Sequence, residues 1–182
     1  SKPPSPPEGE LKTAEIKLME LQIAQESWKA INKMIKKFKL KTLPEIIEKA
    51  EELEIEQKYL EALTENQSYD GEKFVINGYY IPAYRLTNNN NTIKRTAEKV
   101  KTMLNRIQVK ESFEDLTFEG GYITIEDDRV KIYHDEKPSD EVRALIKSKG
   151  FRWSPFWKCW CRKHTENALA VVKFELLPEF NK

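Results

Sequence analysis

The side chains best suited to chemistry gather near the C-terminal end of the chain, in the stretch GFRWSPFWKCWCRKHTENA at residues 150–168. It holds three of the four tryptophans, two phenylalanines, two cysteines and five basic residues, and its first acid is Glu166. Four explanations suit this mixture: a packed β-hairpin, a metal site, a platform for nucleic acid, or a protein-binding surface.

Metal binding would use Cys159, Cys161 and His164, with His134 as a fourth ligand. Alternate residues of a strand share a face, so both sulfurs would point the same way. Structural zinc sites, however, usually space their cysteines by two to four residues, and buried cysteine is a common core residue. We therefore expect reduced thiols and neither a metal nor a cofactor.

Catalytic groups are sparse. His134 and His164 are the only histidines, and the segment EGG at 119–121 is too short for a phosphate-binding loop. The carboxylates of IEDDRVKIYHD at 125–135 fall at a predicted turn, where aspartate is ordinary. We expect a protein that is not an enzyme.

Charge is strongly segregated although the net charge is only +1. Residues 29–41 carry six lysines and no acid, whereas residues 45–65 carry eight glutamates and two lysines. Such blocks suit a polyanion or a charged partner, but they are equally typical of solvated helix surfaces that pair with one another. If nucleic acid binds, weakly and in a salt-sensitive manner, we expect the contacts at Lys33, Lys36, Lys37, Lys94 and Arg95.

The N-terminal part is predicted to be helical. The proline-rich residues 1–7 are expected to form a disordered leader, and residues 8–66 are expected to form a helical hairpin. Its first helix runs from Glu10 to about Lys41, and a capping box of Thr42 and Glu45 starts the second. The chain has no apolar run near 18 residues and no basic-then-apolar leader, so we expect no membrane span and a location in the cytoplasm.

A connector is expected at residues 67–111. It begins with a β-hairpin that turns at Asn77-Gly78, and the four asparagines at 88–91 form a loop that caps the next helix. The buried stripe of that helix is predicted to be Ile93, Ala97, Val100, Leu104 and Ile107.

Residues 112–182 are predicted to form a small module with the order β-β-α-β-β-α. A hairpin turns at Asp127-Asp128, Ser139 caps a helix that Gly150 ends, and Thr165 caps a last helix that ends before Pro178. The predicted fold class of the chain is α+β, with helices packed on one side of an antiparallel sheet.

Within the second hairpin of this module, Phe151, Trp153 and Trp160 are expected to anchor to the last helix. Ser154-Pro155 begins the turn, which would leave the tip less buried than Trp153. The residues expected to bind a partner are Arg152, Phe156, Trp157, Lys158, Arg162 and Lys163.

The segment KIYHDEKPSDEVRALIKSKGFRWSPFWKCWCRKHTENAL at 131–169 resembles a small module of proteins from phages, plasmids and other mobile elements. YRLTNNNNTIKR at 84–95 and INKMIKKFK at 31–39 resemble the segments that precede that module, so the resemblance covers about residues 28–175. Stand-alone chains of this size with this module resemble the type II-A anti-CRISPR proteins, which inhibit Cas9.

The resemblance implies a non-enzymatic inhibitor that binds Cas9 with its guide RNA and blocks DNA targeting or cleavage. Cas9 holds nucleic acid in positively charged channels, where the acidic residues of 45–65 or 111–141 would compete. The alternative is a nucleic-acid-binding accessory protein of a phage or plasmid, which contacts DNA directly through the basic helix and the 150–163 hairpin.

Overall fold

A computed structural model describes residues 7–182, so the predicted leader lies outside the described residues except for Pro7, where the first helix begins. The chain forms two compact units. The N-terminal unit is Thr13–Lys99, and the C-terminal unit combines Val100–Lys182 with residues 7–12. Helix makes up 58 % and strand 21 %, and every strand pairing is antiparallel, which confirms the α+β class. Nothing in the described range combines the length and the apolar character of a membrane-spanning helix.

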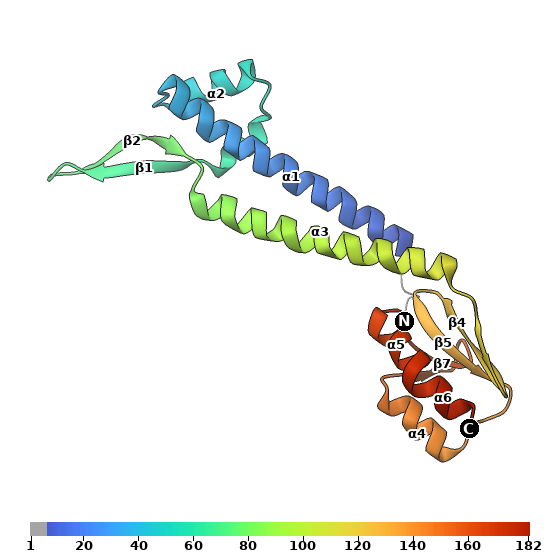
Figure 1. The fold of residues 1–182 in the computed structure, drawn as a ribbon. Helices are drawn as coiled ribbons and strands as arrows, with labels where there is room; N and C mark the ends of the chain where they lie inside the picture. The colour runs from blue at the N-terminus through green and yellow to red at the C-terminus, as the bar shows by residue number, and fades with distance from the viewer. Residues whose placement is uncertain (1–6) are drawn as a thin grey trace. The chain divides into compact units, whose positions relative to one another are not determined.

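Two long helices dominate the N-terminal unit. Helix α1 (Pro7–Phe38) is unbroken, and its Leu21–Trp28 segment lies beside the start of α3 (Ala83–Ser112) (Figure 1). The Asn89 side chain on α3 donates to the Leu21 carbonyl at 3.0 Å, and the Arg85 guanidinium lies 5.6 Å from the Trp28 ring centre. These contacts fix the pairing of the two helices within this unit.

A short helix, α2 (Leu43–Glu52), packs against α1 and contributes to the hydrophobic cluster of this unit. Helix α2 starts with the predicted capping box, in which Thr42 Oγ1 accepts from the Glu45 amide and the Glu45 carboxylate accepts from the Thr42 amide at 3.1 Å. The turn η1 (Gln57–Ala62) follows. The buried members of the cluster are Ile31, Met34, Ile46, Ala50, Ala62 and Ile81.

A hairpin forms at the start of the connector, but its turn and its first strand differ from the prediction. Strands β1 (Thr64–Tyr69) and β2 (Phe74–Tyr80) join through residues 70–73, where the Asp70 carboxylate accepts from the backbone of Glu72 and Lys73. The predicted turn at Asn77-Gly78 is wrong, because these two residues lie inside β2 at a register shift opposite Asn66. Gly78, with φ +136°, allows this β-bulge.

The loop predicted at the four asparagines is also wrong, because residues 88–91 lie inside α3. Asparagine is a weak helix former, but tertiary contacts override propensity. The Asn89 amide donates to the Leu21 carbonyl and to Gln25 Oε1, the latter at 2.9 Å, and Gln25 is buried. The same contacts set the phase of α3.

That phase differs from the predicted stripe by one residue. Thr96 and Met103 follow Asn89 at heptad spacing and are buried, whereas Ala97 is exposed and Leu104 is 48 % exposed. Val100 is the member of the predicted stripe that is buried. The spacing of apolar residues alone therefore predicted the wrong buried face of α3, and the correct face is the one that contains Asn89.

Replacing Asn89 by alanine should therefore destabilise the protein by about 1–3 kcal/mol, because Gln25 Oε1 would stay buried without its donor. Chemical denaturation followed by circular dichroism measures this loss. Asn90, which is exposed in the same helix, provides the matched control. Asn90→Ala should be neutral or slightly stabilising, since alanine is the better helix former; equal losses in both variants would contradict the role of Asn89.

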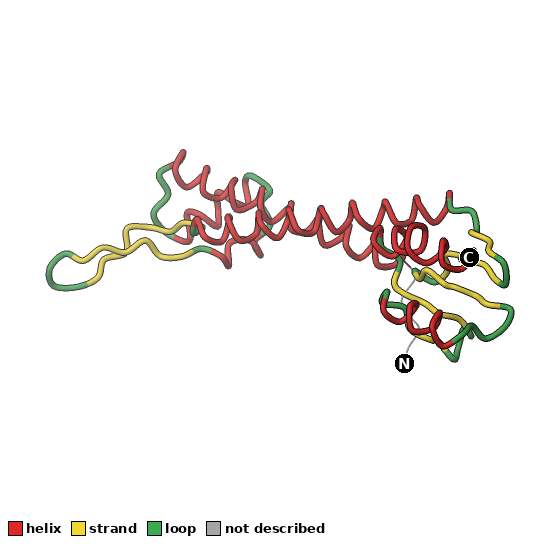
Figure 2. The backbone as a smooth tube through the Cα atoms, turned by 60° about the horizontal axis from the view of Figure 1, so that its bottom comes forward, coloured by secondary structure: helices red, strands yellow, loops and turns green. Residues whose placement is uncertain are grey.

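The C-terminal unit is a five-stranded sheet in the order β3-β4-β5-β7-β6, with helices on one face (Figures 1 and 2). Its strands are β3 (Leu116–Phe118), β4 (Gly121–Glu126), β5 (Arg129–His134), β6 (Arg152–Ser154) and β7 (Cys159–Lys163). Its short helices are α4 (Asp140–Ser148), α5 (Glu166–Val171) and α6 (Leu177–Phe180). From β4 onward the order is β-β-α-β-β-α, as predicted.

Local signals place these elements correctly. Asp127 and Asp128 both have φ near +55°, as a two-residue hairpin turn requires. Ser139 and Thr165 accept from the amides three residues ahead and cap α4 and α5, and Gly150 has φ +82° just after α4. The predicted hairpin and both predicted caps are confirmed.

The last helix does not end before Pro178, contrary to the prediction. After α5 the backbone widens into a π-helical turn, η2 (Val172–Leu176), and α6 begins at Leu177 with Pro178 in its first turn. Proline is tolerated there because its missing N–H would have no intrahelical partner. The chain therefore continues in helical form to Phe180 and brings that ring to within 4.8 Å of Phe118, centre to centre.

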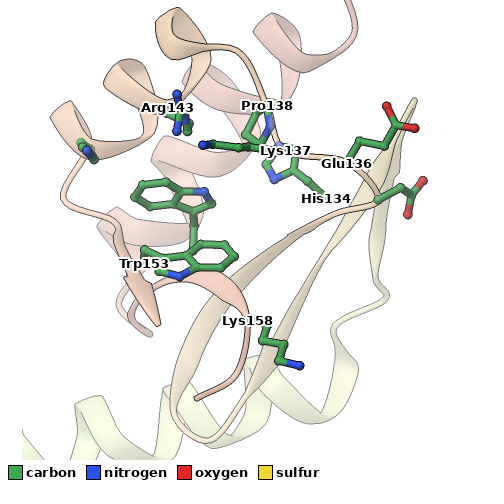
Figure 3. Close-up of a pocket in the computed structure, with 10 residues that line it drawn as sticks. His134, Glu136, Lys137, Pro138, Arg143, Trp153 and Lys158 are labelled. Atoms are coloured by element: carbon green, nitrogen blue, oxygen red, sulfur yellow. The ribbon is translucent and has the colours of Figure 1, made fainter. Parts of the chain in front are cut away.

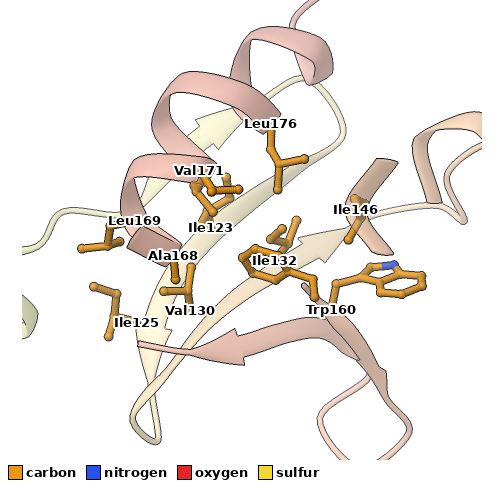
Figure 4. Close-up of a cluster of buried hydrophobic side chains, with 12 residues drawn as sticks. Ile123, Ile125, Val130, Ile132, Ile146, Trp160, Ala168, Leu169, Val171 and Leu176 are labelled. Carbon is orange, nitrogen blue, oxygen red and sulfur yellow. The ribbon is translucent and has the colours of Figure 1, made fainter. Parts of the chain in front are cut away.

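The core of the C-terminal unit lies between the sheet and its helices (Figure 4). Alternate residues of β4 and β5 face inward, and the helices contribute the opposite side. Its buried members are Ile123, Ile125, Val130, Ile132, Ile146, Phe151, Trp160, Ala168, Leu169, Val171, Val172 and Leu176.

Candidate functional site

The turn between β6 and β7 carries three of the six residues expected to bind a partner, Phe156, Trp157 and Lys158. Phe156 is 84 % exposed, in keeping with a place at the tip. Ser154 shapes the turn, because its carbonyl accepts from the Lys158 amide at 2.8 Å and its hydroxyl accepts from the Trp157 amide at 3.2 Å. Lys158 adopts φ +54° at the end of the turn.

Trp157 folds back onto the sheet. The Lys131 ammonium lies 4.0 Å from the centre of its ring and is also paired with Asp127 at 2.6 Å. Lys131 is 1 % exposed and points away from the core side of the sheet, since its neighbours Val130 and Ile132 point inward. Trp157 thus covers a buried cation on the face opposite to the helices.

The three remaining partner-binding candidates do not form one surface. Arg162 lies on the helix side of the sheet and donates to the Lys149 carbonyl at 3.0 Å, where it satisfies the C-terminal end of α4. Arg152 and Lys163 are exposed. Since Arg152 pairs with Cys161, it projects from the opposite side of the sheet to Arg162.

The expected burial of Trp153 is wrong. Trp153 is 52 % exposed, whereas its cross-strand partner Trp160 is 4 % exposed and belongs to the core. The two rings meet edge to face, 5.7 Å apart. The reason is topological: β6 is an edge strand of three residues, so Trp153 lies at the margin of the core and shields Trp160 from the side.

Beside this exposed indole the surface encloses a cavity of about 540 Å³. It lies between the β5–α4 connection, the Arg143 and Lys147 side of α4 and the β6–β7 hairpin (Figure 3). The residues that line it are His134, Asp135, Glu136, Lys137, Pro138, Arg143, Lys147, Trp153, Lys158 and Trp160. Lys158 is the one residue of this set that was predicted to bind a partner.

Positive charge surrounds the tryptophan pair. Arg143 and Lys137 lie on the α4 side of the cavity and Lys158 lies on the other side of Trp153 (Figure 3). The Lys147 ammonium is 5.8 Å from the centre of the Trp160 ring. Arg143 contacts the exposed carboxylate of Asp140, and the Glu136 carboxylate points away from Trp153 (Figure 3). The arrangement combines an exposed aromatic face with cations on two sides.

His134 is the titratable group at the inner end of the cavity. Its ring meets Phe118 and Phe180 edge to face, each at 5.3 Å, and both ring nitrogens lie without a hydrogen-bond partner among residues 7–182. Burial lowers the pKa of His134 below its usual range, while the charge of Asp135 acts in the opposite direction. The imidazole is therefore neutral at pH 7.

The cysteines pack on the sheet. Cys159 is buried and Cys161 is half-buried, and the pKa of each thiol is raised, chiefly by burial. His164 lies beyond the end of β7, is 2 % exposed, and its backbone amide donates to the Asp128 carbonyl. Within the described part of the chain, no three side chains of the metal-binding types gather closely enough to hold an ion.

The basic residues proposed for nucleic acid lie on the N-terminal unit, and all five are exposed. Lys33, Lys36 and Lys37 belong to α1, and Lys94 and Arg95 belong to α3. Of the five, Lys36 borders a second hollow.

Sequence reasoning missed most of the Trp153 cavity. Lys137, Arg143 and Lys147 received no role, although Arg143 and Lys147 are four residues apart on the predicted helix and so share a face. That spacing was the signal available in the sequence. Trp153 was assigned to the core because strand alternation gives no information about which strand lies at the edge.

Residues 134–178 match the model of a family described as "Domain of unknown function (DUF8626)". No curated protein and no solved structure matches the chain. The matched segment begins at His134, runs through α4 and the β6–β7 hairpin, and ends within α6. All ten residues that line the cavity fall inside it.

Proposed function

We propose that this protein is a non-enzymatic, nucleic-acid-binding accessory protein of a mobile element, and that its C-terminal unit holds single-stranded nucleic acid in the Trp153 cavity. The protein would act in the cytoplasm of the host cell. The observation that carries the proposal is the half-exposed indole of Trp153 at a cavity of about 540 Å³ that four cationic side chains border. A cavity of this size lies within the range of small-ligand sites, about 300–1,000 Å³.

The chemistry of the cavity suits an unpaired nucleotide. A base that stacks on an exposed aromatic side chain gains about 1–3 kcal/mol, whichever base it is. Lys137, Arg143 and Lys147 on one side, with Lys158 on the other, would neutralise the adjoining phosphates. A base can stack on the Trp153 ring only after it leaves its own stack, and this favours single strands over a duplex.

A non-enzymatic role is supported by the state of His134. The ring is neutral, lies between two phenylalanines, and has no hydrogen-bond partner among the described residues. A catalytic histidine is usually oriented by a second side chain that hydrogen-bonds one of its ring nitrogens, and His134 has no such group among residues 7–182. The carboxylate nearest in sequence, Asp135, acts on His134 by charge and forms no hydrogen bond with its ring among residues 7–182.

Trp153→Ala provides the test. We expect the variant to bind a fluorescently labelled decathymidylate about 10- to 100-fold more weakly than the parent protein, because one stacking contact is lost. Fluorescence anisotropy at low and at moderate salt measures the affinity, which should fall with salt in the parent. Phe156→Ala is the matched control, since Phe156 is more exposed and does not line the cavity.

Two results would contradict the proposal. The first is the absence of binding by the parent protein at low salt. The second is an equal effect of the Trp153 and Phe156 substitutions, which would place the contact elsewhere on the hairpin.

A specific observation also favours the second candidate, an inhibitor of Cas9. All eight glutamates between residues 45 and 65 are exposed on the N-terminal unit, and such a surface could compete with nucleic acid for a positively charged channel. A pull-down with Cas9 loaded with guide RNA, run beside the anisotropy assay, separates the two candidates. Capture of Cas9 that survives Trp153→Ala favours inhibition, whereas oligonucleotide binding without capture favours the accessory protein.

A further inference from the structure

The second hollow lies in the N-terminal unit, where the end of α1 approaches the β1–β2 hairpin, and has a volume of about 330 Å³. The residues that line it are Ile35, Lys36, Lys39, Leu40, Lys41, Asn66, Asn77, Gly78 and Tyr79. Three of them are lysines, two carry side-chain amides, and none is acidic. We call this site the lysine hollow.

Its lysines are not neutralised by the protein. Lys36, Lys39 and Lys41 are exposed and take part in no ion pair within residues 7–182. Elsewhere in the same unit Lys29, Lys49 and Lys58 each pair with a nearby glutamate. Like charges that share one hollow repel one another, and a bound anion would remove that repulsion.

The β-bulge supplies the polar side of the hollow. The pairing of β1 with β2 passes from Asn66 opposite Gly78 to Gln67 opposite Ile76, so Asn77 is the extra residue. A bulge of this kind re-aims a side chain, and bulges are common beside functional sites. The Asn77 amide donates one hydrogen to Ser68 Oγ at 2.8 Å. An amide group has two hydrogens to donate, so the second remains for a ligand.

The segment that follows α1 packs against the β-bulge and forms the other side of the hollow. At Gly78, whose φ is +136°, a side chain would begin only 3.8 Å from Lys41, so the bulge and the lysine segment lie against each other. The lysines of one segment and the asparagines of the other therefore line the same hollow. Cations with amide donors recognise the oxygens of phosphate.

We propose that the lysine hollow binds phosphate groups. The site lies on a different unit from the Trp153 cavity, and the inference goes beyond the function proposed for that cavity. The phosphate could belong to the backbone of a nucleic acid or to free polyphosphate, because both present the same oxygens. The two sources are distinguished below by competition.

The direct experiment is calorimetric titration of the full protein with inorganic tripolyphosphate at constant ionic strength. The test variant is Lys36→Gln with Lys41→Gln, and the control is Lys33→Gln with Lys37→Gln. Each removes two charges near the C-terminal end of α1, but Lys33 and Lys37 do not line the hollow. We expect the dissociation constant to rise about tenfold or more in the test variant and less than about twofold in the control, since charge-assisted contacts are lost only in the former.

Nuclear magnetic resonance of the unmodified protein gives a readout that does not depend on variants. Tripolyphosphate should shift the side-chain amide signals of Asn66 and Asn77. The signal of Asn89, whose amide is hydrogen-bonded to α1, should not move. Displacement of tripolyphosphate by decathymidylate that carries no terminal phosphate would identify the nucleic-acid backbone as the source of phosphate. Failure of that displacement, with binding intact, would identify free polyphosphate.

The inference is overturned if the unmodified protein does not bind tripolyphosphate, or if the test and control variants weaken binding equally. Trp153→Ala separates this outcome from that of the proposed function. If this substitution abolishes tripolyphosphate binding, the anion occupies the Trp153 cavity, and the lysine hollow is rejected while the cavity is retained. If it leaves tripolyphosphate binding unchanged and weakens oligonucleotide binding, both sites stand.

Discussion

Trp160→Ala is expected to lower the free energy of unfolding by about 3–5 kcal/mol, a large part of the stability of a small domain. Trp160 is 4 % exposed, pairs with Ile132 across the sheet and belongs to the core of the C-terminal unit. Its removal would leave a cavity among the inward-facing strand residues and α4 (Figure 4). Urea denaturation followed by circular dichroism measures the loss.

Trp153→Ala is the comparison that makes this result informative. The two tryptophans face each other across β6 and β7, but Trp153 is 52 % exposed, and its substitution removes mainly the edge-to-face contact. Such a contact contributes about 0.5–1.5 kcal/mol. A larger loss for Trp153→Ala than for Trp160→Ala would mean that the inner and outer positions of the pair are reversed.

The second large effect is expected at Gly121, the first residue of β4. A methyl group on this residue would lie 2.0 Å from the Tyr133 carbonyl oxygen and 2.6 Å from the Phe118 ring. The carbonyl belongs to the neighbouring strand, so relief requires the β4–β5 ladder to shift. Gly121→Ala should therefore destabilise the protein by about 3 kcal/mol or more, which thermal and urea unfolding would both record.

Gly120 is the natural control, because it lies one residue earlier and has no heavy atom within 4 Å of the position of an added methyl group. Its φ of +92° still disfavours a side chain, and the conformational cost is about 1–2 kcal/mol. The order of the two losses is the decisive point. If Gly120→Ala proves more harmful than Gly121→Ala, crowding at the start of β4 is not what requires glycine there.

The C-terminal unit was the part of the fold best predicted from sequence, because short-range chemistry specifies it. The Asp127-Asp128 turn, the Ser139 and Thr165 caps and the glycine after α4 each act within a few residues. Their information is therefore present in any short window of the sequence. Strand order is not, and the position of β6 at the sheet edge decides which tryptophan is exposed.

The N-terminal unit was predicted less well for the opposite reason. Residues 88–91 are helical because Asn89 finds acceptors on α1, which lies more than sixty residues earlier in the sequence. The bulge at Asn77 likewise depends on its cross-strand partner. Both features result from contacts between distant segments, and neither local propensity nor apolar spacing records them.

The candidate sites follow the same division. Lys158 and Lys36 were named from sequence as members of basic stretches, but the residues that share a cavity with each of them lie on separate elements. Trp157, expected at an exposed tip, instead covers Lys131, and this cation–π contact needs the pairing of β5 with β7. The sequence therefore identified individual basic and aromatic residues, but it did not show which of them lie together in one site.

The π-helical turn η2 lies between Thr165 and Phe180, and the number of residues in this segment sets the direction in which the Phe180 side chain points. Such a turn holds an additional residue within an otherwise α-helical segment, and each residue of an α-helix advances by about 100° around the axis. Deletion of one residue from an α-helical part of this segment would rotate Phe180 away from Phe118 and His134 if α5 kept its place on the core. Deletion of one residue within η2 would instead return the widened turn to α-helical geometry, so η2 is the place in this segment where a change of length by one residue is best tolerated.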